Sequence, residues 1–109
     1  MKSPTESVLS TDALVISPNG RFLYAVQTQS SSITVFSISS DGMLKRIPGR
    51  TTTSPLPLNM AIDKSGRFAY VICQLGTDPP SGTREIDQFK ISPNGQLIPL
   101  KQGIFRDYG

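Results

Sequence analysis

The chain has 109 residues and a formal net charge of +3, with 17% charged residues, no histidine and one cysteine. The lack of histidine excludes a Ser-His-Asp triad, a Cys-His pair and a His-ligated zinc site, and a single cysteine excludes an internal disulfide. The basic residues are scattered, with Lys45 and Arg46 as their only adjacent pair, so the positive charge predicts no nucleic-acid surface.

Residues 1–12 are expected to form a polar lead-in. They contain no apolar core after Lys2, so they predict no signal peptide. No apolar run in the chain approaches the ~18 residues that a membrane-spanning helix needs, so we expect no membrane insertion. The absence of a signal peptide from this chain favours a cytoplasmic location.

The first structural unit is expected over residues 13–49. Short β-branched and aromatic runs at 13–16, 21–27, 33–38 and 43–47 predict four strands. Asn19-Gly20 and Asp41-Gly42 predict tight hairpin turns, the first of type I′. The unit is therefore predicted to be an antiparallel sheet of sequential hairpins.

A linker is expected at residues 50–58, where Pro55 and Pro57 oppose strand pairing. The second unit, residues 59–103, repeats the order of the first, with an inserted loop at 76–83. Its predicted strands share the composition of the first four and cover residues 59–62, 67–74, 85–91 and 96–101. Residues 104–109 are expected to form a tail.

The two units are copies of one pattern. Residues 16–24 and 62–70 share five identities in nine positions at an offset of 46, and residues 33–44 and 86–97 share six in twelve at an offset of 53. The seven additional residues are absorbed by the inserted loop. A repeat of this period predicts stacked supersecondary units.

The strands at 22–26 and 68–73 are apolar on both faces, because neither carries an alternation of apolar and polar residues. A strand of this kind needs cover on both sides, unlike one in a sheet with a solvated face. Four antiparallel strands per unit with packing on both faces is the blade of a β-propeller. The predicted fold class is all-β, with two four-stranded antiparallel propeller blades forming a partial propeller.

Three motifs in the first unit strengthen this interpretation: Ser-Pro-Asn-Gly-Arg-Phe-Leu-Tyr at 17–24, Ile-Thr-Val-Phe-Ser-Ile at 33–38 and Asp-Gly-Met-Leu at 41–44. In this order they resemble blades of the seven-bladed β-propeller lactonase family, the bacterial-type phosphogluconolactonase group. The resemblance covers residues 13–47 and 59–101. It implies a ring that hydrolyses a sugar lactone without a cofactor or metal. The alternative is a non-catalytic propeller scaffold or protein-interaction module.

Two blades leave two apolar faces without cover, so the expected partners are the remaining blades, or further copies of the chain that close a ring. Family blades often carry a His in their first strand and Asn-Glu after the Tyr. The corresponding positions here are Ala13 and Asn59 for the His, and Gln27-Thr28 and Cys73-Gln74 for the pair, so none matches. The catalytic residues therefore remain unassigned.

Four residues are the candidate ligand-binding groups, at the mouth of the ring or beside the inserted loop: Asn59, Gln74, Arg84 and Glu85. The competing interpretation is that they are structural polar residues. Arg21 and Arg67 recur in both units and are expected to be structural. Cys73 lies in a predicted core strand, without a cation nearby in the sequence, and is expected to be inert.

Asp41, Asp63 and Asp87 give only a weak indication of acid–base chemistry, because Asp41 lies in a turn and the other two occupy different positions in the repeat.

Overall fold

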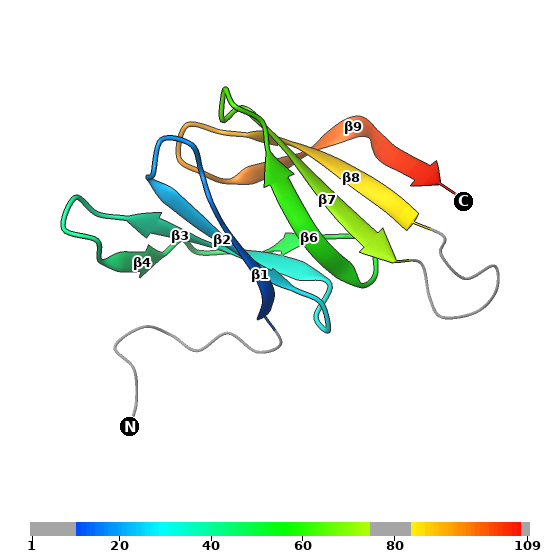
Figure 1. Cartoon of the computed structure of the whole chain (residues 1–109), viewed down its shortest axis with the longest axis horizontal. Coiled ribbons are helices and arrows are strands. Elements are labelled where there is room, and N and C mark those ends of the chain that lie inside the picture. The colour runs from blue at the N-terminus through cyan, green and yellow to red at the C-terminus, as the bar shows by residue number, and fades with distance from the viewer. Residues whose placement is uncertain (1–10, 75–83, 108–109) are drawn as a thin grey trace.

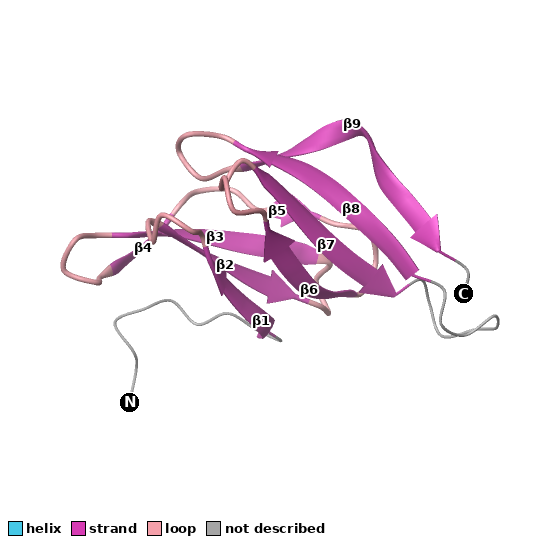
Figure 2. Cartoon of the chain, turned by 45° about the horizontal axis from the view of Figure 1, so that its top comes forward, coloured by secondary structure: helices cyan, strands magenta, loops and turns pink. Residues whose placement is uncertain are grey.

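The computed structural model describes residues 11–74 and 84–107, and every regular element among them is a strand (Figures 1 and 2). In chain order the strands are β1 (Thr11–Ile16), β2 (Phe22–Gln27), β3 (Ser32–Ile38), β4 (Leu44–Arg46), β5 (Thr51–Thr52), β6 (Pro57–Ile62), β7 (Phe68–Gln74), β8 (Arg84–Ile91) and β9 (Leu97–Asp107). Within those ranges no helix is long and apolar enough to cross a membrane.

The strands form two antiparallel sheets, which confirms the predicted all-β class. One sheet has the order β1-β2-β3-β4, and the short β5 pairs with the other end of β3. The other has the order β6-β7-β8-β9. We call them the first and the second blade. In each blade neighbouring strands are consecutive in the sequence, as expected for a series of hairpins.

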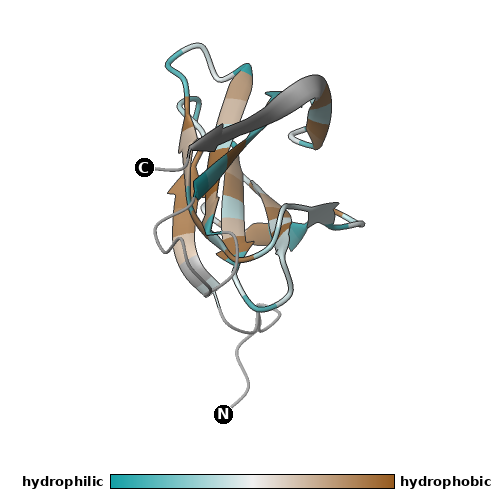
Figure 3. Ribbon diagram, turned by 90° about the vertical axis from the view of Figure 1, so that its right-hand side faces the viewer, coloured by the Kyte–Doolittle hydropathy of each residue, from teal (hydrophilic) through white to brown (hydrophobic). Residues whose placement is uncertain are grey.

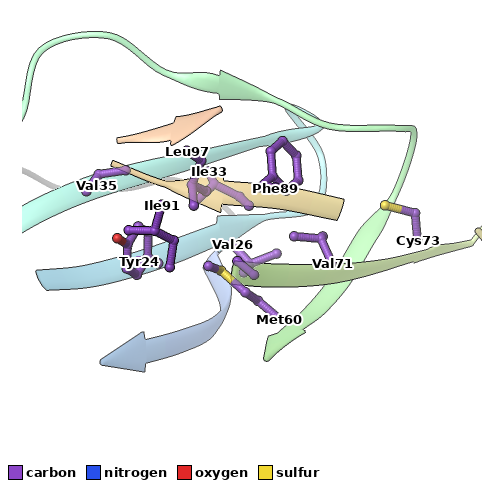
Figure 4. Packing of buried hydrophobic residues seen from close by; sticks show 11 residues of the cluster. Tyr24, Val26, Ile33, Val35, Met60, Val71, Cys73, Phe89, Ile91 and Leu97 are labelled. Carbon is purple, nitrogen blue, oxygen red and sulfur yellow. The ribbon is translucent and has the colours of Figure 1, made fainter. Parts of the chain in front are cut away.

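The two blades pack face to face, and their first strands, β1 and β6, lie side by side (Figure 1). Opposed residues such as Tyr24 and Val35, or Val26 and Ile33, share one face of the first blade. That face packs against Val71, Phe89 and their neighbours in the second blade (Figure 4). We call this interface the seam. The members of its buried cluster are Tyr24, Val26, Ile33, Val35, Met60, Ala69, Val71, Cys73, Phe89, Ile91 and Leu97.

The β8–β9 hairpin of the second blade packs against Tyr24 and Phe22 of the first blade. The Tyr24 hydroxyl donates a hydrogen bond of 2.7 Å to the carbonyl oxygen of Gly95, and Tyr24 is fully buried. The ring of Phe22 lies so close to Gly95 that a Cβ atom there would be 2.4 Å from its Cδ1. Only glycine therefore fits at this point of contact. Figure 3 shows the apolar strands of both sheets and their more polar connecting turns.

The β1–β2 turn differs from the predicted type I′ turn. The amide of Gly20 donates to the carbonyl of Ser17 (2.8 Å), and Gly20 has a φ of 73°, whereas Asn19 does not have a positive φ. This pattern is a type I turn over Pro18-Asn19 followed by a glycine in the left-handed region, the commoner form of a longer hairpin loop. The type I′ prediction was wrong, but the hairpin itself is present.

Several predicted boundaries also move. β1 begins at Thr11, inside the predicted lead-in, and the linker at 50–58 contains β5 and the start of β6. β9 continues to Asp107, which pairs with Arg84, so residues 104–107 belong to the second sheet and not to a tail. Long strands continue while a neighbour supplies hydrogen bonds, and β8 does so here. The inserted loop at 76–83 lies outside the described residues.

Candidate functional site

The predicted site residues lie at one end of the second blade, where β7 ends and β8 begins. Gln74 and Arg84 are directly opposed in the β7–β8 ladder, and Asn59 is opposed to Ile72, two residues before Gln74. Opposed residues, and residues two apart on one strand, point to the same face of a sheet. Asn59, Gln74 and Arg84 therefore share one face of the second blade.

That face is the one turned away from the seam. It carries Phe68, Tyr70, Ile72 and Ile86, and we call it the open face. Tyr70 is 39% exposed, and Ile72 and Ile86 are half-buried. A shallow hollow of about 220 Å³ lies there, lined by Asn59, Met60, Ala61, Tyr70, Ile72 and Ile86. Asn59 is thus an amide at the margin of an apolar surface.

Glu85 does not join the other three predicted residues. It is opposed to Cys73, on the face directed at the seam, and only 3% of it is exposed. Because successive side chains of a strand point to opposite faces, Glu85 and Arg84 lie on opposite faces of β8. Arg84 and Glu85 therefore do not act as one charged pair on a common surface.

A polar network lies at the same end of the blades. Gln27, which is buried, accepts a hydrogen bond of 2.8 Å from the Thr34 hydroxyl within the first blade, on its face directed away from the seam. Two further bonds join the first blade to the connection between the blades. The Thr28 hydroxyl donates to the carbonyl of Pro57 (2.6 Å), and the Thr53 amide donates to the carbonyl of Ser31 (2.9 Å). These bonds attach the connection between the blades to the β2–β3 loop, so this end of the seam is a fixed surface.

Asp87 has the best-defined role in this network, and sequence reasoning missed it. Its carboxylate accepts hydrogen bonds of 2.7 Å from both the amide and the hydroxyl of Ser54, and the residue is 6% exposed. Two charge-assisted bonds to one residue form a strong anchor. Asp87 therefore fastens the inter-blade connection to β8. The sequence carries little signal for this role, because β8 also contains other polar and charged residues, namely Arg84, Glu85, Gln88 and Lys90.

Cys73 is not an activated nucleophile. Its side chain is fully buried, and this burial, together with the negative charges of Asp87 and Glu85, raises the pKa of the thiol from 9.0 to about 12. A hydrogen bond with Thr53 acts in the opposite direction but is the smaller effect. Because the thiolate is the reactive form, Cys73 is inert at neutral pH, as predicted.

Arg67 and the turn aspartates stabilise the hairpins. The Arg67 guanidinium lies 5.9 Å from the centroid of the Phe68 ring and its Nε donates to the Ser65 hydroxyl (3.3 Å). Hydrogen bonds from Ser39 and Ser65 lower the pKa of Asp41 and of Asp63, respectively. Asp63 also accepts from the amide of Phe68 (3.1 Å). These contacts support the predicted structural role of Arg67 and place both carboxylates in turns.

The described residues include no group of three His, Cys, Asp or Glu side chains that could hold a metal ion. At the candidate site they offer two amides and one guanidinium on the open face. Such groups donate hydrogen bonds to anionic or carbonyl oxygens and do not accept a proton from water. The arrangement can therefore bind and polarise an oxygen ligand, but it lacks a base.

Comparison with known proteins identifies similar chains. The family model described as "Lactonase, 7-bladed beta-propeller" matches residues 3–104. A 6-phosphogluconolactonase of Serratia proteamaculans is 42% identical over 73 residues, which are 67% of this chain and 22% of that protein. A 6-phosphogluconolactonase of Erwinia tasmaniensis is 35% identical over 86 residues, 78% of this chain and 24% of that protein. The chain thus spans about a quarter of the length of these curated relatives.

Solved structures share the fold. A protein of Bacteroides fragilis superposes with a TM-score of 0.76 at 23% identity, covering 93% of this chain and 27% of that one. A protein of Desulfotomaculum acetoxidans gives a TM-score of 0.70 at 17% identity, covering 84% of this chain and 26% of the other. At these identities the likeness shows the two-blade architecture alone.

Proposed function

This chain belongs to the seven-bladed β-propeller lactonase family, and from that premise we propose that it supplies two adjacent blades of a lactonase-like ring. The whole ring hydrolyses a sugar lactone such as a phosphogluconolactone. The observation that carries the proposal is the family match over residues 3–104, supported by relatives that are named 6-phosphogluconolactonase. The formation of a complete seam between the two blades supports their role as neighbours in a ring.

Lactone hydrolysis defines what the ring must provide. Water adds to the lactone carbonyl carbon, the carbonyl oxygen becomes an oxyanion, and the ring C–O bond then breaks to give a hydroxy acid. The reaction needs a base that takes a proton from water and donors that stabilise the oxyanion. The amides of Asn59 and Gln74 are suited to the second task. The Arg84 guanidinium is suited to binding a phosphate group through paired N–H donors.

In this proposal none of the four candidate residues is the base. Glu85 is the only carboxylate among the four candidates, and it is directed into the seam and 3% exposed. A buried residue on the opposite face cannot contact a ligand held by Asn59 and Arg84. These candidates therefore contribute binding groups, and the base is a residue outside the four.

The alternative function is a non-catalytic propeller scaffold or protein-interaction module. One observation favours it: among the described residues of the candidate site, no carboxylate faces the same side as Asn59, Gln74 and Arg84. Propellers serve many unrelated functions on the same architecture. A measurement of lactone turnover by the ring distinguishes the two functions.

The test is opening of 6-phosphogluconolactone by the ring that contains this chain, with Arg84→Ala as the variant. Loss of the guanidinium is expected to raise KM about tenfold or more, because a charge-assisted bidentate contact contributes roughly 1.5–3 kcal/mol. The matched control is Lys90→Ala, an exposed cation on the same face and the same strand but at its other end, which should leave KM unchanged.

Two results contradict the proposal. A ring that opens the lactone no faster than the spontaneous reaction favours the scaffold function. Equal KM values for Arg84→Ala and the unsubstituted ring remove Arg84 from the binding site, even if the ring is active.

A further inference from the structure

A hollow of about 390 Å³ lies between the connection of the two blades and the start of β9. Its lining includes the buried Val35 and Leu97, the half-buried Ile47, and Ile98, which is 47% exposed. Ligand sites in proteins commonly have a volume of this order and a mostly apolar lining. The hollow is formed by these two blades alone, and it lies apart from the open face.

A second hollow of about 260 Å³ extends the first. The two share Thr52 on the side of the connection and Pro99 on the side of β9. Together they follow β9 from Gln96 to Leu100, a strand length of about 16 Å. We call this combined space the connection groove. Its elongated form suits an extended chain better than a compact molecule.

The side of the connection groove that β9 forms is a free strand edge. β9 is the last strand of its sheet. The Ser92 amide donates to the carbonyl of Gln96 (2.9 Å), and the next opposed pair is Ile91 and Leu97. Because bonded and non-bonded pairs alternate in an antiparallel ladder, the amide and carbonyl of Leu97 point away from β8. No described strand pairs with this edge, so it can accept an additional strand.

The larger hollow also carries a positive charge without a matching negative one. Arg50 belongs to its lining, whereas no carboxylate does. Arg50 is exposed and forms no ion pair with the carboxylates of the described residues. The smaller hollow contains Asp87, but two hydrogen bonds from Ser54 already hold that carboxylate. A guanidinium binds a carboxylate through two parallel hydrogen bonds, so Arg50 favours an acidic ligand.

We propose that the connection groove binds an extended, acidic peptide of a partner protein as an additional strand beside β9. The peptide residue that pairs with Leu97 is aliphatic, because paired residues share a face and the side chain of Leu97 is buried in the seam. An acidic residue two positions away points to the same side, towards the wall that carries Arg50. The four candidate ligand-binding residues do not line the groove, so the inference is independent of lactone hydrolysis.

The probe is the amidated heptapeptide Thr-Glu-Thr-Leu-Thr-Glu-Thr with fluorescein at its N-terminus. Its glutamates lie two positions from the leucine on both sides, so it can bind in either strand direction. Fluorescence anisotropy measures its Kd with the 109-residue chain. Saturable binding is expected, and Arg50→Glu should raise Kd about tenfold or more because it replaces attraction with repulsion.

Lys45→Glu is the matched control for this charge reversal. Lys45 is an exposed cation of the neighbouring β4, and it does not line the groove. The same change of charge there should alter Kd less than about threefold, since exposed charges at a distance are screened by salt. A peptide with lysine in place of both glutamates should bind the Arg50→Glu chain more tightly than the unsubstituted chain.

Methylation of peptide amides tests the strand pairing without any change in the protein. An N-methyl group on the leucine removes the donor for the Leu97 carbonyl and should raise Kd about tenfold or more. The same group on the following threonine, whose amide points away from β9, should have little effect. In addition, hydrogen exchange of the Leu97 amide, measured by NMR, should slow about fivefold or more when the peptide binds.

Four results would overturn the proposal. The first is the absence of saturable binding at up to about 1 mM protein. The second is an equal Kd for the Arg50→Glu and Lys45→Glu chains. Displacement by 4-methylpentanoate with the Kd of the peptide would favour a small carboxylate ligand. Self-association of the chain in sedimentation, with slowed exchange of the Leu97 amide and no peptide present, would favour a second copy. None of these measurements involves lactone turnover, so failure of this inference and failure of the proposed activity are distinguishable.

Discussion

The hydroxyl of Tyr24 and the carbonyl oxygen of Gly95 are joined by a buried hydrogen bond of 2.7 Å across 71 residues of sequence. Tyr24 belongs to β2 of the first blade, and Gly95 to the β8–β9 hairpin of the second. Burial raises the pKa of the Tyr24 hydroxyl from 10.0 to about 12, so it remains a donor at any ordinary pH. This bond therefore connects the last hairpin of the second blade to an inner strand of the first blade.

Replacement of Tyr24 by phenylalanine should weaken the seam. The change removes the donor and leaves the Gly95 carbonyl buried without that partner, which costs about 1–2 kcal/mol. Urea unfolding of Tyr24→Phe should show this loss as a lower midpoint with an unchanged slope. Tyr70→Phe is the matched control, since Tyr70 is 39% exposed in this chain, and should change the free energy of unfolding by less than about 0.5 kcal/mol. Equal effects at both positions would contradict the role given to the bond.

Gly95 should tolerate alanine less well than Gly42. Both residues have a positive φ, 89° and 86°, so both alanine variants incur a backbone cost of about 1–2 kcal/mol. Only Gly95→Ala adds a collision with the Phe22 ring. We expect it to lose about 1–3 kcal/mol more than Gly42→Ala, and Phe22→Ala should abolish the excess in a double-mutant cycle. Similar losses in the two single variants would show that the ring moves aside.

The repeat made the blades predictable because it depends on local patterns. Apolar strands and glycine turns at corresponding positions predict hairpins, and apolar residues on both faces of β2 and β7 predict cover on both sides. The prediction of the turn type was wrong because Pro18, with φ fixed near −65°, favours a type I turn that starts before Asn19. That signal is local and was present in the sequence.

The site was less predictable because it depends on which face of a strand is covered. Alternation alone places Arg84 and Glu85 on opposite faces, but it does not say that the face of Glu85 is the buried one. The bond between Ser54 and Asp87 joins a linker to a strand 33 residues away. Nothing in the local pattern predicts such a contact, since it follows from the path of the connection between the packed blades.

Asp87 should contribute more to the free energy of unfolding than its position in a strand suggests. Asp87→Ala removes both acceptors of Ser54 and releases the connection between the blades, with an expected loss of about 2–3 kcal/mol. Ser54→Ala should lose about 1 kcal/mol, and the two changes should be less than additive because they remove a shared contact. Thermal or urea unfolding of the four proteins in the cycle gives the coupling, and Lys90→Ala on the same strand serves as the exposed control. Strict additivity would mean that the two residues act independently.

Stability should fall on the alkaline side because Cys73 is buried as a neutral thiol. The folded chain keeps the thiol proton up to about pH 12, while the unfolded chain loses it above about pH 9.0. The unfolded state therefore binds fewer protons in this window, and the free energy of unfolding decreases as pH rises, by roughly 1.4 kcal/mol per pH unit for one group. Below pH 9 the contribution is constant.

Unfolding by urea at about pH 8, 9 and 9.5 measures this slope, and Cys73→Ala should flatten it although the substitution itself lowers stability through lost packing. Tyr24→Phe is the control variant, because the Tyr24 hydroxyl also has a raised pKa in the folded chain. Its pKa of 10.0 in the unfolded chain means that it affects stability only at higher pH than Cys73 does. Between pH 8 and 9.5, therefore, the slope of Tyr24→Phe should match that of the unsubstituted chain, and only the slope of Cys73→Ala should differ. If both variants keep the unsubstituted slope, the alkaline loss arises from other groups, and the Cys73 thiol is not held neutral by its surroundings.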